Sequence, residues 1–235
     1  MRRTVLTRHP SYAQDGEDLL LDDLLDHKAE GFYVDVGAYH PTEFSNTKVF
    51  YDRGWSGINI EPVHHRYVEL SKARPRDLNL NVGVASRAGV AELYCMEPAG
   101  LTTFVRSESE RLCQFDGHRL VEVRRVEVTP LSAILDAHGH LPHIDFLSVD
   151  VEGAERDVLE SNDWLKYRPS VVLIESAQYF PTSQTQRPST FERWADVLAH
   201  NHYVHLGDTT CNSFFGDAGQ ANVLAAARRL WTTAR

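Results

Sequence analysis

The sequence is poor in the residues and motifs that mark several large classes of protein. Its three cysteines, Cys95, Cys113 and Cys211, are widely spaced and odd in number among 235 residues. They fit neither a disulfide framework nor a CxxC metal site, so we expect free thiols in a reducing cytoplasm. No apolar run reaches the roughly 20 residues that a membrane helix needs. The sequence therefore predicts a cytoplasmic protein with no membrane span and no disulfide scaffold.

Positive charge is also scarce. Lys and Arg number 24 against 33 Asp and Glu, which gives a formal net charge of -9 at pH 7. Non-specific nucleic-acid binding comes mostly from basic side chains that neutralise phosphates, so the charge argues against a nucleic-acid partner. The N-terminal segment MRRTVLTRHP has no apolar stretch behind its arginines. We therefore expect no secretory leader.

Familiar nucleotide and metal motifs are missing as well. Only one glycine, Gly37, follows the first apolar run, so the GxGxxG fingerprint of dinucleotide-binding proteins is absent. Twelve histidines are present, but none falls in an HExxH or CxxC…H spacing. No YxxxK pair occurs. These absences count against a nicotinamide-dependent oxidoreductase and against a zinc site of known spacing.

What is present is an ordinary globular composition, with 42% apolar and 24% charged residues. Short apolar runs alternate with helical patterns, which predicts an α/β fold with a mostly parallel, doubly wound sheet in a single domain over residues 1–235. The expected strands cover residues 31–37, 56–62, 77–85, 143–150, 169–176, 202–207 and 212–215, and the expected helices cover 15–27, 41–53, 64–73, 130–139, 153–161 and 188–200.

Residues 86–128 interrupt this order. Gly89 precedes the alternating run VAELYCM, which indicates a hairpin, and VEVRRVEV at 121–128 alternates like a solvent-facing strand. We interpret the region as an insertion or flap near the acceptor site. Several of its side chains either shape that site or simply pack the flap: Phe104, Arg106, Arg111, Phe115 and His118.

Two residues follow the first two strands at places where open α/β sheets bind ligands. Gly37 lets the backbone approach a ligand closely, and Glu61 can accept hydrogen bonds from both hydroxyls of a ribose. Taken singly, each has a plain alternative: a strand-to-helix turn for the glycine and a solvated carboxylate for the glutamate. Together they form the minimal nucleoside site of a doubly wound fold. Because His40 follows the same turn, we expect it to lie beside a nucleoside bound there.

Acidic residues follow the fourth and fifth strands. Asp150 and Glu152 alternate along an extended chain and would point to the same side, while Glu175 ends the neighbouring strand. Two carboxylates on adjacent strand ends suit a hard cation such as Mg²⁺ or a general base. Helix capping is the alternative for Glu152 and Glu155, and we expect it to account for Glu155 entirely.

Six segments in order resemble the FkbM-type class I S-adenosylmethionine-dependent methyltransferases, and the resemblance spans about residues 11–215. The segments are SYAQDGED (11–18), GFYVDVGAYHPTEFSNT (31–47), RGWSGINIEP (53–62), GLTTF (100–104), SVDVEGAERDVL (148–159) and RPSVVLIE (168–175). The resemblance implies a Rossmann-like fold with an antiparallel C-terminal strand and an inserted flap. It also implies that the helical segment 11–30 lies over the cofactor site.

The resemblance assigns residues position by position. Asp35, Gly37 and Ala38 resemble the cofactor-binding turn, Glu61 the ribose-binding acid, and residues 81–84 the adenine-lining stretch. The full set implied to bind S-adenosylmethionine is Gln14, Asp35, Gly37, Ala38, His40, Ser45, Asn46, Glu61, Pro62, Gly83 and Asp150. The implied catalytic residues are Asp150, Glu175, His40 and Glu152, with Asp150 and Glu175 as ligands of a Mg²⁺ ion. Ser176 replaces a third acid often found in sugar O-methyltransferases of this fold.

The predicted function is S-adenosylmethionine-dependent methylation of a hydroxyl group, most often on a sugar or a hydroxylated small molecule. Two alternatives remain open from the sequence: an NAD-dependent sugar oxidoreductase and a non-catalytic nucleoside-binding module. Self-association through the extra hairpin or the helical tail LAAARRLW (224–231) is also open.

Overall fold

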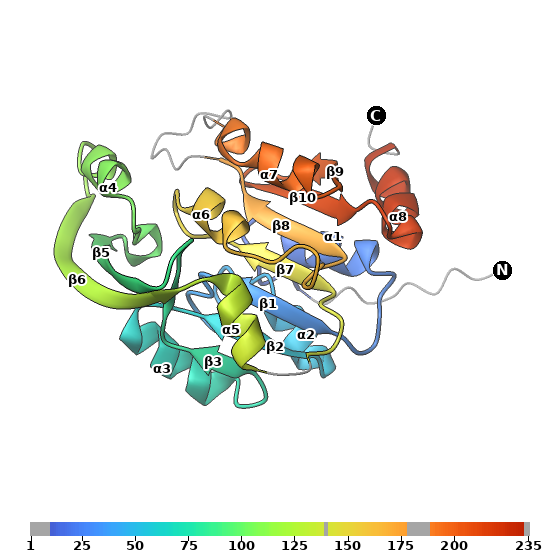
Figure 1. The fold of residues 1–235 in the computed structure, drawn as a ribbon, viewed down its shortest axis with the longest axis horizontal. Coiled ribbons are helices and arrows are strands. Elements are labelled where there is room, and N and C mark those ends of the chain that lie inside the picture. The colour runs from blue at the N-terminus through green and yellow to red at the C-terminus, as the bar shows by residue number, and fades with distance from the viewer. Residues whose placement is uncertain (1–9, 139–140, 178–188, 233–235) are drawn as a thin grey trace.

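The computed structural model describes residues 10–138, 141–177 and 189–232, and these form an α/β fold built on two sheets (Figure 1). The larger sheet has seven strands in the order β3-β2-β1-β7-β8-β10-β9. Its strands are β1 (Phe32–Val36), β2 (Ser56–Ile60), β3 (Leu78–Leu80), β7 (Phe146–Val149), β8 (Val171–Glu175), β9 (Tyr203–Asp208) and β10 (Asn212–Asp217).

Strand direction in the larger sheet matches the sequence prediction. Strands β1, β2, β3, β7 and β8 pair in parallel, whereas β10 runs antiparallel to both β8 and β9. The mostly parallel sheet with an antiparallel C-terminal strand is therefore confirmed. Successive apolar side chains along a strand point to opposite faces of the sheet, so each face carries its own core.

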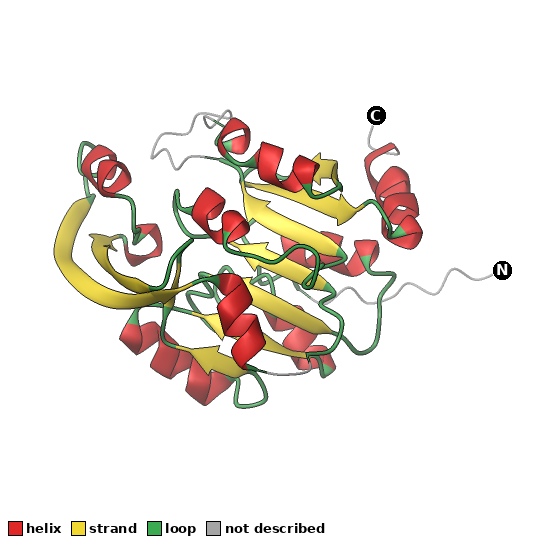
Figure 2. Cartoon of the chain, in the orientation of Figure 1, coloured by secondary structure: helices red, strands yellow, loops and turns green. Residues whose placement is uncertain are grey.

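Helices cover both faces (Figure 2). One core joins the sheet to α5, α6 and α7 through side chains such as Val34, Leu135 and Val158, and the other joins it to α1, α2 and α8 through Leu21, Phe50 and others. The helices are α1 (Glu17–Leu24), α2 (Lys48–Arg53), α3 (His64–Ala73), α4 (Arg106–Leu112), α5 (Leu131–Ala137), α6 (Glu155–Glu160), α7 (Ala195–His200) and α8 (Ala221–Thr232).

The C-terminal helix α8 is part of the fold. Val223, Ala226 and Ala227 are buried in the second core, and the Trp231 ring lies 5.6 Å from the Phe214 ring. The apolar side of the tail, which the sequence leaves open as a self-association surface, thus contacts the sheet of its own chain.

The smaller sheet is the predicted flap. Strand β5 (Gly89–Glu97) pairs antiparallel with β6 (Arg119–Thr129), and the short β4 (Gly83–Val84) adds to the base of β6. Between the two long strands lie the 3₁₀ turn Ala99–Leu101 and α4. The hairpin curves away from the larger sheet, with α4 at its outer end (Figure 1). Most of β6 is exposed, as expected for a solvent-facing strand, and the exposure includes the apolar Val121 and Val123.

Two predicted elements in the first half of the chain are wrong in extent. The strand expected over 77–85 is divided, because β3 joins the larger sheet and β4 joins the smaller one. The helix expected over 41–53 begins only at Lys48. Residues 41–47 instead form turns, with Phe44 at φ +54° and the hydroxyls of Ser45 and Thr47 bound to the buried Arg74 guanidinium.

The helix expected over 188–200 is interrupted. A 3₁₀ turn covers Phe191–Arg193, and α7 follows only from Ala195, with Trp194 buried between them. Its expected first residue, Pro188, lies outside the described residues, as does the segment 1–9 for which no leader is expected. Among the described helices, none is both long enough and apolar enough to cross a bilayer.

Candidate active site

The site lies where strand order reverses, between the carboxyl ends of the adjacent strands β1 and β7. Gly37 follows β1 and Asp150 follows β7, and the Asp150 N–H donates to the Val36 carbonyl over 3.0 Å. Gly37 has φ +84°, and a Cβ atom there would lie 1.8 Å from the Asp150 carbonyl oxygen. Glycine is therefore required for close approach of two strand ends of this chain, in addition to any approach of a ligand.

A first cavity extends from Gly37 over the ends of β2 and the base of the hairpin. Its walls are largely apolar, and Glu61 is the carboxylate after β2. The Tyr39 N–H donates to Glu61 Oε2 over 2.9 Å and the Val63 N–H to Oε1 over 2.7 Å, which fixes the carboxylate in one orientation. Burial raises the pKa of Glu61 to about 7. Each oxygen keeps a lone pair for a further donor.

The predicted adenine-lining stretch also reaches this cavity. Val82, Gly83 and Val84 line it together with Pro62, and Leu93 and Phe104 of the flap add to its walls. Asn81 instead donates from Nδ2 to the Glu61 and Pro62 carbonyls, over 2.9 and 3.0 Å. Asn81 thus positions the end of β2 and does not line the cavity itself.

A second cavity adjoins the first and is far more polar. Gly37, Tyr39, Gly100, Asp150 and Glu152 line both cavities. Many of the predicted cofactor-binding and catalytic residues meet in the second one: Gln14, Asp35, Ala38, Ser45, Asn46 and Glu175. Among the described residues, the lining side chains include four carboxylates but no lysine, arginine or histidine.

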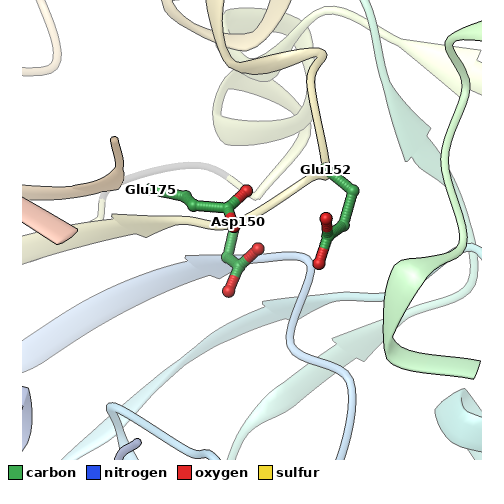
Figure 3. A group of neighbouring side chains, drawn as sticks. All are labelled: Asp150, Glu152 and Glu175. Carbon is green, nitrogen blue, oxygen red and sulfur yellow. The ribbon is translucent and has the colours of Figure 1, made fainter. Parts of the chain in front are cut away.

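Three of these carboxylates form a compact cluster (Figure 3). Asp150, Glu152 and Glu175 each offer an oxygen within 4.8 Å of the others. Asp150 follows β7, Glu175 ends β8, and Glu152 reaches the cluster from a turn with φ +54°. Burial and the mutual repulsion of the acids raise the pKa values of all three. Such a set of oxygen donors fits a hard cation such as Mg²⁺.

A family model for the methyltransferase FkbM domain matches residues 35–205, which hold both cavities except for Gln14. The chain belongs to the FkbM methyltransferase family. This membership supports methyltransferase activity over the oxidoreductase and binding-module alternatives. None of the curated proteins matches the chain in sequence.

Two buried acids order the segment before the matched FkbM domain, and a backbone hydrogen bond joins that segment to the domain. Asp18 accepts hydrogen bonds from Ser11 Oγ over 2.7 Å and from the Tyr12 N–H over 2.8 Å. Glu17 accepts from Thr209 and Asn212 beside β10. The Ser45 N–H then donates to the Tyr12 carbonyl over 3.1 Å. These bonds hold residues 11–18 against the second cavity, where Gln14 is part of the wall.

A buried hydrogen-bond network beside the second cavity was not predicted from the sequence. Thr47 Oγ1 donates to Asp35 over 3.0 Å, and Arg74 donates to the Pro41 carbonyl and to the hydroxyl oxygens of Ser45 and Thr47. Arg74 is 1% exposed. Arg74 lies in the C-terminal turn region after α3, so nothing in its local sequence distinguishes it from a surface arginine.

His40 has a different position from the one expected. Its Nδ1 accepts hydrogen bonds from the backbone N–H groups of Thr42 and Glu43, over 3.2 and 2.9 Å. It is not among the residues that line either cavity. The geometry therefore gives His40 a part in the turn of residues 40–43.

The flap and α6 both form hydrogen bonds to the turn that carries Glu152. Thr103 Oγ1 donates to the Glu152 carbonyl over 2.8 Å, which joins the flap to the turn of the acidic cluster. Of the flap residues singled out from the sequence, Phe104 lines the first cavity, whereas Arg106, Arg111, Phe115 and His118 line neither. Glu155 accepts from the Gly153 N–H over 2.8 Å at the start of α6, as expected for a capping residue.

Proposed function

We propose that this protein transfers the methyl group of S-adenosylmethionine to a hydroxyl oxygen of a saccharide. The observation that carries the proposal is the pair of adjoining cavities. The first has largely apolar walls and a carboxylate, Glu61, that two backbone N–H groups hold in one orientation, which suits a nucleoside. The second is lined by carboxylates, hydroxyls and amides, which suit a polyhydroxylated acceptor.

In this proposal the donor spans the boundary between the cavities. Glu61 accepts from the ribose hydroxyls, and residues 82–84 contact the adenine. Gly37 and Ala38 lie beside the sulfonium end, where Asp35, Gln14, Ser45 and Asn46 bind the amino-acid part of the donor. Asp150 and Glu152 belong to both cavities, so the methyl group would face them.

The reaction is an in-line displacement. The acceptor oxygen forms a bond to the methyl carbon while the carbon–sulfur bond breaks, and adenosylhomocysteine leaves with that electron pair. The sulfonium is already activated, so the protein mainly aligns the reactants and removes the hydroxyl proton. We assign proton removal to Asp150, because its raised pKa of about 7 suits a base near neutral pH. Glu152 and Glu175 would orient neighbouring hydroxyls.

A Mg²⁺ ion fits the same carboxylates. Asp150 and Glu175, with Glu152 beside them, would hold it through their oxygens. When bound, the ion supplies positive charge that lowers the pKa of a hydroxyl group. The roles of Gly37, Glu61 and the donor cavity do not depend on it.

The experiment is a transfer assay with S-adenosylmethionine that carries a deuterated methyl group. The protein is incubated with mono- and oligosaccharides in Mg²⁺, Mn²⁺ or EDTA, and products are identified by mass spectrometry. We expect labelled O-methyl sugar, with turnover reduced about 100-fold or more in Asp150→Asn. Calorimetric titrations with adenosylhomocysteine and NADH run in parallel. Binding of NADH alone, or label on no saccharide, would contradict the proposal.

A further inference from the structure

Phe44 is an unusual side chain at the wall of the second cavity. It is 64% exposed, whereas Phe50, Phe146 and Phe214 are fully buried. Phe44 lines the cavity together with the acidic cluster, and its ring stacks on no other aromatic ring in the described part of the chain. Single exposed hydrophobic residues are common on protein surfaces, so exposure alone assigns no role.

The backbone at Phe44 distinguishes it from an ordinary surface residue. Its φ is +54°, a left-handed conformation that bulky residues rarely adopt. The flanking residues hold it there: Arg74 donates to the Pro41 carbonyl and to Ser45 Oγ, and the Ser45 N–H donates to the Tyr12 carbonyl. The fold thus maintains an unfavourable conformation that keeps an aromatic ring exposed. Conformations of this kind cluster at functional sites.

The remainder of the cavity indicates what the ring would contact. Pro98 and Leu101 of the flap add apolar wall, while the acidic cluster of Asp150, Glu152 and Glu175 supplies carboxylates. A pyranose matches this combination, because its ring presents a face of C–H groups and a rim of hydroxyls. The C–H face packs on an aromatic ring, and the hydroxyls donate to carboxylates.

We propose that Phe44 is the stacking platform for a pyranose ring of the acceptor, and so determines acceptor specificity. The proposal rests on the saccharide methyltransferase function proposed above and extends it to a named subsite. It predicts that the ring C–H groups of the acceptor lie against Phe44 while the rim hydroxyls face the acidic cluster. The donor contacts assigned above do not include Phe44, so donor binding is expected not to depend on it.

The test is acceptor binding by saturation-transfer NMR, with the protein saturated with adenosylhomocysteine. The probes are the methyl α-pyranosides of glucose, galactose, mannose, rhamnose and fucose. We expect binding of at least one, with the strongest saturation on its ring C–H protons, and an affinity reduced about tenfold in Phe44→Ala. Phe44→Tyr keeps the ring and retains affinity. Leu165→Ala is the matched control, because Leu165 is 94% exposed and lines neither cavity.

A second variant separates binding from folding. Phe44→Gly removes the ring and also relieves the left-handed backbone, so its melting temperature stays the same or rises while pyranoside affinity falls. A lower melting temperature with unchanged affinity would show a merely structural role and overturn the proposal. Equal affinity of Phe44→Ala and wild type overturns the platform but leaves the methyltransferase function standing. A wild-type protein that binds adenosylhomocysteine and none of the pyranosides contradicts both the platform and the saccharide acceptor.

Discussion

Glu61 is the residue on which donor binding depends in this account, and its pKa gives a test. Burial raises that pKa to about 7, so the side chain is largely protonated at pH 6 and ionised at pH 8. Only the ionised form accepts hydrogen bonds with both oxygens, so adenosylhomocysteine affinity should rise with pH through 7 and level off above it. Glu61→Gln should bind about 10-fold to 100-fold more weakly and lose the pH dependence.

Titration calorimetry at pH 6, 7 and 8 measures this prediction. Glu110→Gln is the control, since Glu110 is an exposed glutamate of α4 that lines neither cavity. A wild-type affinity that falls as the pH rises, or a Glu61→Gln protein that binds as tightly as wild type, contradicts the role of Glu61.

Gly37 gives a second prediction at the scale of one residue. Gly37→Ala adds a Cβ atom 1.8 Å from a backbone oxygen at φ +84°, so we expect a loss of about 3 kcal/mol or more in the free energy of unfolding. Gly117→Ala also places an alanine in the left-handed conformation, at φ +79°, but with open space around its Cβ atom. It should lower the free energy of unfolding by about 1–2 kcal/mol. Urea unfolding of both variants measures the difference. Equal losses would mean that the contact with Asp150 does not constrain Gly37.

The residues found from the sequence share one property. Gly37, Glu61, Asp150 and Glu175 all follow apolar runs, and an open parallel sheet brings the ends of such runs to one edge. No apolar run of this kind precedes Arg74 or Phe44 in the sequence. The role of Arg74 depends on acceptors about 30 positions earlier, and the position of Phe44 depends on the turn that Arg74 holds.

At the scale of elements, the strands were predicted well and the connections less well. Helix α3 has the predicted bounds, because its end is marked by a proline. The sequence of residues 41–47 predicts the start of a helix, but long-range hydrogen bonds to Arg74 and Tyr12 hold these residues in turns. Local sequence does not contain those partners. The division of residues 77–85 between two sheets depends likewise on β6, far along the chain.

The contact between the flap and the acidic turn gives a prediction at this scale. Thr103 is fully buried, donates to the Glu152 carbonyl and accepts from the Val105 N–H. Thr103→Val leaves both backbone groups without this partner, so we expect a loss of about 1–3 kcal/mol in stability. Hydrogen exchange should accelerate in residues 99–105 and 151–154.

Thr103→Ser is the matched control, because it keeps the hydroxyl and should exchange nearly as slowly as wild type. If the valine and serine variants exchange alike, the hydroxyl does not join the flap to the turn.

At the scale of the whole molecule, we expect the acidic site to lower the stability of the free protein. The pKa of Glu175 is raised by burial and by its acidic neighbours, so the folded state binds protons more tightly than the unfolded state. Stability contributed by this group is therefore lost as the pH rises through the raised pKa. Glu175→Gln removes one repelling charge and should raise the melting temperature in EDTA by about 2–4 °C or more at pH 8, with a smaller gain at pH 5.

The same melting experiment examines the cation. If the cluster holds Mg²⁺, added MgCl₂ should raise the melting temperature of wild type, because a ligand bound only to the folded state stabilises it. Glu175→Gln should respond less. A wild-type melting temperature that does not move with MgCl₂ would remove the metal from the account and leave Asp150 as a base without metal assistance.

The most direct measurement is a crystal structure of the protein with adenosylhomocysteine. The account predicts the ribose hydroxyls on the Glu61 carboxylate, the adenine beside residues 82–84, and the sulfur near Gly37 with its open side toward Asp150 and the acidic cavity. A nucleoside bound elsewhere, or a sulfur that faces away from Asp150, would contradict the central claim that donor and acceptor meet where the two cavities join.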